Sequence, residues 1–236
     1  MKKVYLHIGL PKCATTYLQK WVFPFVEGAH YLGRPYADDR IKKLENAFYK
    51  GKNIMCLDPC REFYGACIYS SEGFSNPLLL KTQSDYIERL KLFSERAFPG
   101  REVIFLVTTR PKNEWIQSFY KQFMQDWFYK DAEAMLRRHY DYFCLTVIPE
   151  LKKTNRVVEI PISDLDSEMV NFFKYKVKND RILKSKVNIS SSGIFEPHNR
   201  FSILVIKFIK IFRKFLTKSQ FDFLISPLRK KVYVGK

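Results

Sequence analysis

The first segment that could carry out chemistry is a loop over residues 9–16, between an apolar strand predicted at 4–8 and a helix start predicted at Thr15. A strand–loop–helix unit directs several backbone N–H groups at one point, with the positive end of the helix dipole behind them. This arrangement suits a phosphate or a sulfate. The loop has the length of the Walker A pattern G-x-x-x-x-G-K-[ST], but Ala14 replaces the second glycine and Thr15 replaces the lysine. The lysine lies three residues earlier, at Lys12, so the sequence predicts an anion-binding loop that is not a Walker A loop.

A second constellation follows an apolar run at 103–109, which has the length of a strand. Arg110 and Pro111 come directly after this run, and Ser118 lies eight residues beyond Arg110 on the helix expected next. A guanidinium fork suits a phosphate dianion. Ser118 lies two helical turns into the helix, so it can share the helix face that begins at the strand end. These residues predict a second anion-binding position.

Together the two segments resemble the nucleotide-dependent sulfotransferases, which use 3′-phosphoadenosine 5′-phosphosulfate (PAPS). The loop pattern of that family is roughly P-K-x-G-T-T-x-L, and residues 11–18 read Pro-Lys-Cys-Ala-Thr-Thr-Tyr-Leu. The second signature of the family is an arginine at a strand end, then a proline, and a serine eight residues after the arginine. The positions that match it are Arg110, Pro111, Trp115, Ser118 and Tyr120. The resemblance implies PAPS as the donor, 3′-phosphoadenosine 5′-phosphate (PAP) as the product, and no metal.

In the family, the loop holds the 5′-phosphosulfate, and the arginine and serine bind the 3′-phosphate. The residues that the resemblance assigns to donor binding are Lys12, Cys13, Ala14, Thr15, Thr16, Arg110 and Ser118. Lys12 is also assigned to catalysis, because it can neutralise the bridging oxygen as the donor bond breaks. Ala14 departs from the pattern, where glycine is usual. Alanine is strained there if φ is positive and costs nothing if the residue starts a normal helix.

The acceptor hydroxyl needs a base, and related glycan sulfotransferases use a glutamate while others use a histidine. Glu72, predicted at a strand end in Ser-Ser-Glu, is the first candidate for that general base. His198 is a second candidate, whereas His7 lies inside the predicted first strand and is interpreted as a packed residue. A structural turn or capping role for Glu72 stays open as the alternative.

Weaker similarity extends over residues 1–195, through a strand at 156–160, a turn at 162–165, a helix at 169–173 and the Asn188–Ser190 segment. The last of these resembles a feature of bacterial carbohydrate sulfotransferases. The resemblance therefore implies a hydroxyl of a glycan or glycolipid as the acceptor. The exact acceptor, the sulfated position and the oligomeric state are not predicted, because acceptor loops vary freely on a shared fold.

The composition indicates one basic domain over residues 1–236. The chain has 41 Lys and Arg against 24 Asp and Glu, a net charge of +17, which favours acidic glycans or an anionic membrane as partners. No nucleic-acid-binding motif supports a nucleic-acid partner. The five cysteines, without a recognisable signal peptide, favour a cytoplasmic location, and Cys56, Cys60 and Cys67 lack the spacing of a metal site.

The elements that must position these residues alternate between strand and helix. We expect strands at 4–8, 31–33, 63–69, 103–109 and 156–160, and helices at 15–23, 38–50, 83–98, 112–128 and 131–143. This order predicts an α/β fold with a central parallel sheet flanked by helices, similar to that of P-loop NTPases and implied to be a sulfotransferase fold. Lys12, Glu72 and Arg110 all follow strands, so they are expected at one edge of the sheet.

The segment 201–236 is expected to be different from the rest. Residues 201–216 are almost continuously apolar, and Lys207, Lys210, Arg213 and Lys214 fall on one side at helical spacing. One interpretation is a C-terminal helix packed on the core with a solvated basic stripe. The other is an interfacial helix that holds the protein at the inner face of an anionic membrane.

Two other function classes remain open. A P-loop-like kinase or NTPase would need a loop lysine at position 15 and a Mg²⁺-binding aspartate, and neither signal is present. A non-catalytic basic protein that binds polyanions or membrane could keep the same fold, but it would not need both the loop and the Arg110–Ser118 pair.

Overall fold

The computed structural model describes residues 2–33, 37, 39–50, 52–54, 56, 58–75, 86–126, 132–165, 167, 169, 194–197, 205, 217, 220, 223–224 and 226–232. The chain forms two compact units. The first comprises Met1–Arg110 and His139–Asn188, and the second comprises Pro111–Arg138 and Ile189–Lys236. The expectation of a single domain stays a prediction.

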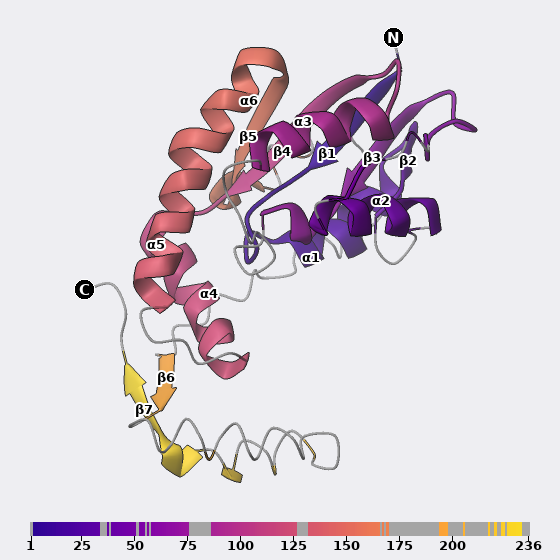
Figure 1. Cartoon of the computed structure of the whole chain (residues 1–236). Helices are drawn as coiled ribbons and strands as arrows, with labels where there is room; N and C mark the ends of the chain where they lie inside the picture. Colours follow the sequence, from indigo (N-terminus) through magenta and orange to yellow (C-terminus); the bar gives the residue numbers. More distant parts are fainter. Residues whose placement is uncertain are drawn as a thin grey trace. The chain divides into compact units, whose positions relative to one another are not determined.

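The first unit is built on a five-stranded parallel sheet with the order β2-β3-β1-β4-β5 (Figure 1). The strands are β1 (Lys3–His7), β2 (Ala29–Tyr31), β3 (Ala66–Ser70), β4 (Glu102–Thr109) and β5 (Arg156–Pro161). His7 on the central strand pairs with Ser70 of β3 on one side and with Leu106 of β4 on the other. The carboxyl ends of these three strands therefore lie next to one another, and the loops that follow them share one edge.

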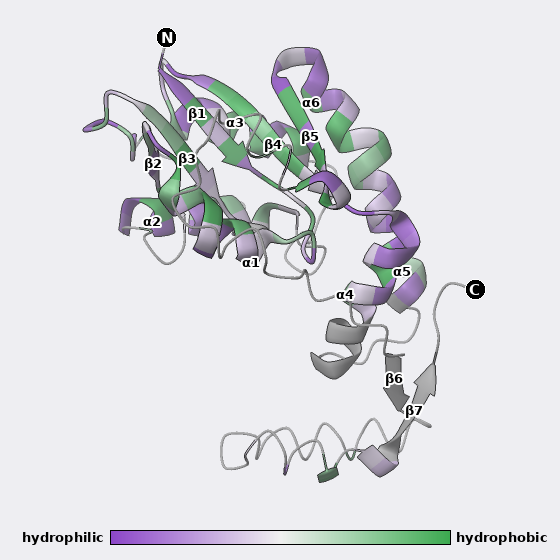
Figure 2. Ribbon diagram, turned by 180° about the vertical axis from the view of Figure 1, so that it is seen from behind, coloured by the Kyte–Doolittle hydropathy of each residue, from purple (hydrophilic) through white to green (hydrophobic). Residues whose placement is uncertain are grey.

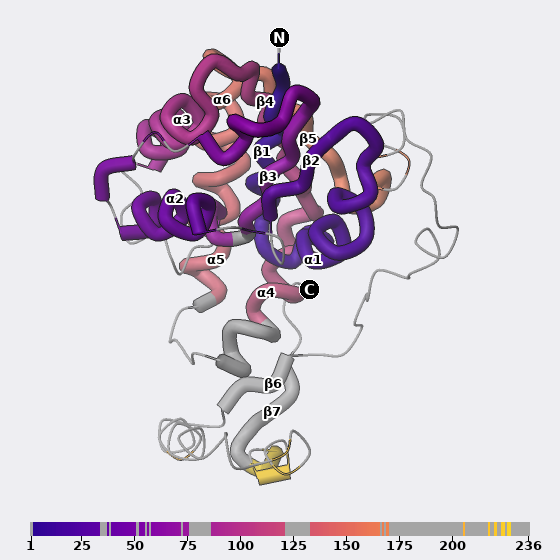
Figure 3. Tube along the Cα trace, turned by 90° about the vertical axis from the view of Figure 1, so that its right-hand side faces the viewer, coloured from indigo at the N-terminus to yellow at the C-terminus, as the bar shows by residue number. Residues whose placement is uncertain are grey.

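Helices cover both faces of this sheet, as Figure 3 shows. One face is covered by the helical segment α1 (Thr15–Tyr17), η1 (Leu18–Val22) and η2 (Phe23–Phe25), which packs its apolar residues on Ile68, Leu106 and Ile160. On the other face Tyr69, the next residue after Ile68, contacts Phe93 of α3 (Tyr86–Ala97). This alternation is the period of two that a strand buried on both faces requires. Figure 2 shows the hydrophobic colour concentrated on the central strands.

The remaining helices of the first unit are α2 (Asp39–Tyr49), the end of α5 (Ala132–Tyr142), η4 (Phe143–Val147) and α6 (Ile148–Thr154). Short 3₁₀ turns lie at η3 (Glu72–Ser75) and η5 (Ile162–Asp164). The predicted α/β class and the parallel sheet are confirmed. Two strands start elsewhere than expected: β2 lies two residues before the predicted 31–33, and β3 begins at Ala66 rather than at Phe63. The helix α6 was not predicted.

The second unit contains α4 (Lys112–Asp126), the start of α5, the turn η7 (Ser226–Leu228), and an antiparallel pair of strands, β6 (Ile194–Pro197) and β7 (Arg229–Val232). The strand pair was not predicted. Most of the predicted basic helix at 201–216 lies outside the described residues, as do Asn188–Ser190 and His198. In the described part of the chain, no helix has the length and apolar character needed to cross a membrane.

Candidate functional site

The loop after β1 has an unusual backbone. Lys12 has φ 68° and Ala14 has φ 58° and ψ 19°, both in the left-handed region that favours glycine. The N–H of Cys13 donates to Leu10 O at 3.1 Å, and the N–H of Leu18 donates to Ala14 O at 3.0 Å. The second of these bonds spans four residues, as in an α-helix, and Ala14 is the N-cap of the helix that begins at Thr15. A left-handed residue followed by a helical one forms the kind of backbone concavity that binds anions.

The sequence left open whether alanine is strained at position 14, and the positive φ of Ala14 shows that it is. An L-residue in this conformation costs roughly 1–2 kcal/mol. Non-glycine residues held in such conformations cluster at ligand sites, where the surrounding structure enforces the strain. The strain at Ala14 and Lys12 is what a loop shaped for a ligand would show.

Thr15 adds a second mark of a ligand site. Its side chain is 2% exposed, and within the described part of the chain its hydroxyl has no hydrogen-bond partner. A buried hydroxyl without a partner costs about 1–3 kcal/mol. An anion held by the loop would supply an acceptor for it. Lys12 and Thr16, by contrast, are exposed and accessible to a ligand from solvent.

Gly9 explains why the loop starts where it does. A Cβ atom on this residue would lie 1.8 Å from Oγ1 of Thr108 and 2.7 Å from Nε2 of His7. Contacts below 3.0 Å between such atoms essentially do not occur, so a Cβ atom at this position would force Thr108 or His7 to shift. The glycine of the sequence motif is thus favoured by the close approach of residue 9 to Thr108 on β4.

Beneath the loop, His7 joins the three central elements through a buried polar network. Its Nδ1 lies 2.7 Å from Ser70 Oγ and its Nε2 lies 3.1 Å from Thr108 Oγ1. Gln19 on η1 donates from Nε2 to the same Ser70 oxygen at 3.1 Å. Burial lowers the pKa of His7 to about 3, so the ring is neutral near pH 7 and can donate at one nitrogen while it accepts at the other. His7 is therefore a packed residue, as expected.

Glu72 is the first residue of η3, directly beyond the carboxyl end of β3. This turn is fixed to the loop after β1, because Ser75 Oγ donates to Gly9 O at 2.7 Å. His139, which is buried, donates from Nε2 to Ser75 O at 3.0 Å. The backbone that carries Glu72 is therefore held at the same edge as the loop.

Arg110 follows β4 at this edge and is 9% exposed. Tyr140 donates its hydroxyl hydrogen to Arg110 O at 2.8 Å. Burial raises the pKa of the Cys13 thiol to about 12, and the guanidinium of Arg110 is close enough to oppose that rise. The Cys13 side chain is fully buried, so it fills space as a neutral thiol. Arg110 and the loop after β1 thus lie together in the first unit.

Ser118 lies on α4 in the second unit and is partly buried. Its predicted partnership with Arg110 stays a prediction.

Several residues at this edge were not found from the sequence. They are Gln19, Ser70, Ser75, Thr108, His139 and Tyr140. Each makes at least one hydrogen bond to an element distant in sequence, so no local spacing identifies it. The only local signal is position, since Ser70 and Thr108 lie at or near the ends of apolar strands.

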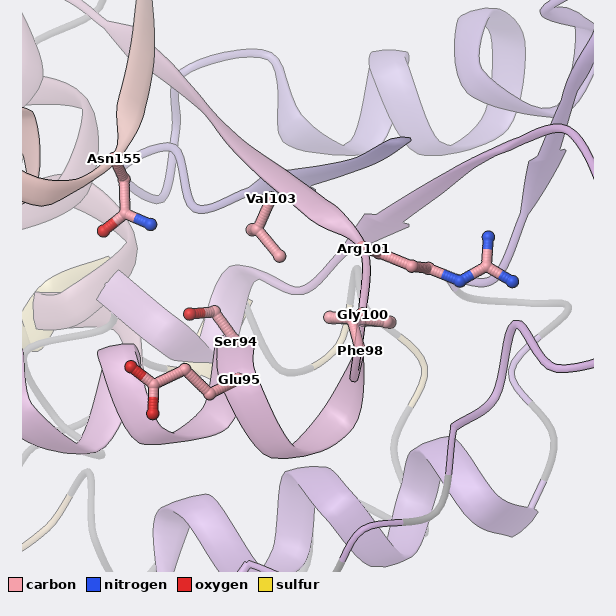
Figure 4. A pocket seen from close by; sticks show the side chains of 7 residues that line it. All are labelled: Ser94, Glu95, Phe98, Gly100, Arg101, Val103 and Asn155. Atoms are coloured by element: carbon pink, nitrogen blue, oxygen red, sulfur yellow. The ribbon is translucent and has the colours of Figure 1, made fainter. Parts of the chain in front are cut away.

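A pocket of about 250 Å³ lies elsewhere in the first unit (Figure 4). Its lining residues are Ser94, Glu95, Phe98, Gly100, Arg101, Val103 and Asn155. Gly100 and Arg101 precede β4, and Asn155 precedes β5, so the pocket lies at the amino edge of the sheet. In Figure 4 the Arg101 side chain points away from the Glu95 carboxylate. The pocket is at the opposite edge from the loop and shares none of its residues.

Comparisons with known proteins found a distant structural likeness and no match in sequence. No family model matches the chain, and no curated protein matches it. Among solved structures, the chain is similar to the sulfotransferase from Alicyclobacillus acidocaldarius, with a TM-score of 0.42 and 14% identity over 96% of each chain. A likeness at this level says nothing about activity or substrate.

Proposed function

We propose that this protein is a sulfotransferase that moves a sulfuryl group from PAPS to a hydroxyl of a glycan or glycolipid. The observation that supports this most is the loop after β1. It combines the buried Thr15 hydroxyl, for which the described residues provide no partner, with a lysine at position 12 instead of the Walker position. Arg110 beside this loop supplies a second cation.

The described residues fit the donor. The hydroxyls of Thr15 and Thr16 and the amides at the helix start would hold the 5′-phosphate, since these groups are donors and lie at the positive helix end. Arg110 would hold the 3′-phosphate, with Ser118 as a proposed second ligand. Cys13 and Ala14 would contribute by shaping the loop, because the Cys13 N–H already bonds Leu10 O.

PAPS, when bound, would supply the sulfuryl group and a phosphate as its leaving group. Lys12 would place an ammonium near the oxygen on which negative charge develops, a form of electrostatic stabilisation that is often the largest contribution to catalysis. The loop and Arg110 would hold the reactants in line. A sulfuryl group carries one negative charge fewer than a terminal phosphate, so the reaction needs less help from a divalent metal.

Glu72 would accept the proton of the acceptor hydroxyl. Its position supports this role at the level of the backbone, because η3 begins beyond β3 and Ser75 ties the turn to Gly9. The acceptor would reach the same sheet edge as the donor loop.

The net charge of +17 supports an acidic acceptor, or a site of action at the inner, cytoplasmic face of an anionic membrane. The preference for a glycan or glycolipid comes from the resemblance of residues 186–190 to bacterial carbohydrate sulfotransferases. Both stay proposals.

A transfer assay tests this function. The protein is incubated with PAPS and a panel of glycans and glycolipids, and the products are searched for sulfate esters by mass spectrometry. We expect Lys12→Ala to lower the turnover by at least ~10²-fold. Lys20→Ala is the matched control, since Lys20 is exposed on η1 close to the loop.

Near-normal transfer by Lys12→Ala would contradict the role of this lysine. Phosphoryl transfer from MgATP instead of sulfuryl transfer would favour the kinase alternative. Tight PAP binding with no transfer to any acceptor would favour the non-catalytic alternative.

A further inference from the structure

The peptide bond that follows Arg110 is constrained from both sides. Tyr140 Oη donates to Arg110 O at 2.8 Å, and the next residue is Pro111, whose ring fixes its own φ. β4 holds the backbone before Arg110, and the bond from Tyr140 holds the peptide after it, so the Cα atom that carries the Arg110 side chain is fixed from both directions. The Tyr140 hydroxyl thus acts on the placement of the guanidinium through the Arg110 backbone.

The Tyr140 hydroxyl is itself held in place. Cys144 on η4 is its close neighbour. A carbonyl oxygen can only accept, so the hydroxyl hydrogen of Tyr140 goes to Arg110 O. Burial, followed by the neighbouring Cys144 thiol, raises the pKa of Tyr140 above its ordinary value, so the phenol keeps the proton that it donates.

The residue before Tyr140, His139, is connected to the loop after β1 at the same edge of the sheet. His139 donates to Ser75 O, and Ser75 donates to Gly9 O. Two adjacent residues of α5 therefore connect the loop after β1 with the end of β4. This is an arrangement that fixes the spacing between two anion-binding positions.

We propose that Tyr140 is a positioning residue that orients Arg110 and so sets the preference of the protein for nucleotides that carry a 3′-phosphate. This inference rests on the proposed function, because Arg110 is assigned there to the 3′-phosphate. A residue that only stabilised the fold would weaken all nucleotides alike, whereas Tyr140 acts on one phosphate.

The test measures the affinities of PAP and of adenosine 5′-phosphate, which lacks the 3′-phosphate, by competition calorimetry. We expect Tyr140→Phe to weaken PAP binding roughly five- to tenfold, the effect of losing one hydrogen bond. Its affinity for adenosine 5′-phosphate should stay within about twofold of the wild type, because that nucleotide does not use Arg110. Tyr142→Phe removes the same hydroxyl from the same helix and should change neither affinity.

A double variant separates the inference from the proposed function. Arg110→Ala alone should weaken PAP binding about 30-fold or more. Adding Tyr140→Phe to it should cause no further loss, because Tyr140 acts through Arg110.

If Tyr140→Phe leaves PAP affinity unchanged, or weakens both nucleotides equally, the inference fails while the proposed function stands. If Arg110→Ala leaves PAP affinity unchanged, the assignment of Arg110 in the proposed function fails, and the inference fails with it.

Discussion

Gly9 approaches Thr108 so closely that a Cβ atom on residue 9 would lie 1.8 Å from the Thr108 hydroxyl oxygen. The same glycine offers its carbonyl oxygen to Ser75 at 2.7 Å. The start of the loop is therefore packed against β4 and hydrogen-bonded to η3. A substitution at Gly9 is expected to disturb both the packing on Thr108 and the geometry of the loop.

Gly9→Ala is expected to lower the free energy of unfolding by about 1–3 kcal/mol, the usual cost of overpacking a core. Thr108→Ala in the same chain should recover part of this loss, because it removes the closest obstacle but leaves His7 Nε2 2.7 Å away. Urea denaturation of the two single variants and the double variant measures the coupling. Strict additivity of the two single effects would show that Gly9 and Thr108 do not clash in this way.

Ala14→Gly is expected to raise the free energy of unfolding by about 1 kcal/mol, because glycine adopts a positive φ without strain. Ala47→Gly is the matched control, since Ala47 lies inside α2 and should lose about 1 kcal/mol on the same substitution. Both values come from denaturant titration. A loss of stability at position 14 similar to that at position 47 would argue against the left-handed conformation.

Stability is expected to fall with pH below about 6.5, the ordinary pKa of an unfolded histidine. Burial holds the pKa of His7 at about 3 and that of His139 at about 4. The unfolded chain then binds more protons than the folded one between these values and pH 6.5, so each imidazole contributes up to about 1.4 kcal/mol per pH unit.

His7→Gln should therefore flatten the dependence of the unfolding free energy on pH between pH 6 and pH 5, whatever its effect on absolute stability. His30→Gln should flatten the slope less than His7→Gln does, because His30 is exposed and burial lowers its pKa less far than that of His7. An equal slope in the wild type and in His7→Gln would mean that His7 is not buried as a neutral ring.

Glu72→Gln is expected to lower kcat by ~10²–10⁴ while PAP binding is retained, because the amide keeps the shape of the side chain but cannot accept the proton. The wild-type rate should also fall at acidic pH, as the carboxylate is protonated. Glu95→Gln, in the pocket at the other sheet edge, is the control and should be fully active. A fully active Glu72→Gln together with an inactive His198→Ala would transfer the role of base to the histidine.

The fold was largely predictable because its signals are local. Apolar runs of strand length alternate with amphipathic helices, and this alternation alone implies a parallel sheet. The start of β3 was placed too early because Phe63 resembles a strand residue, whereas it stacks on His30 and accepts a bond from Arg101 before the strand begins. The helix after Tyr142 was missed because it is continuous with α5 through the π-helical turn η4, where helical periodicity changes.

The candidate site was predictable only in its motif residues. Lys12, Thr15 and Arg110 follow spacings that can be recognised in a linear sequence. His139 and Tyr140 cannot be found in this way, because each bonds a residue that is at least thirty positions away. Ala14 is a third case. The sequence left open whether its backbone is strained, and the φ of 58° shows that it is.

The most direct test of the account is a calorimetric titration of the protein with PAP in the presence of a metal chelator. We expect binding in the micromolar range, about 8 kcal/mol, without any metal. Arg110→Ala should weaken this binding by roughly 2–4 kcal/mol, because a charge-assisted contact to the 3′-phosphate is lost. Absence of PAP binding, with MgATP bound instead, would contradict the central claim that this loop and Arg110 form a site for PAPS.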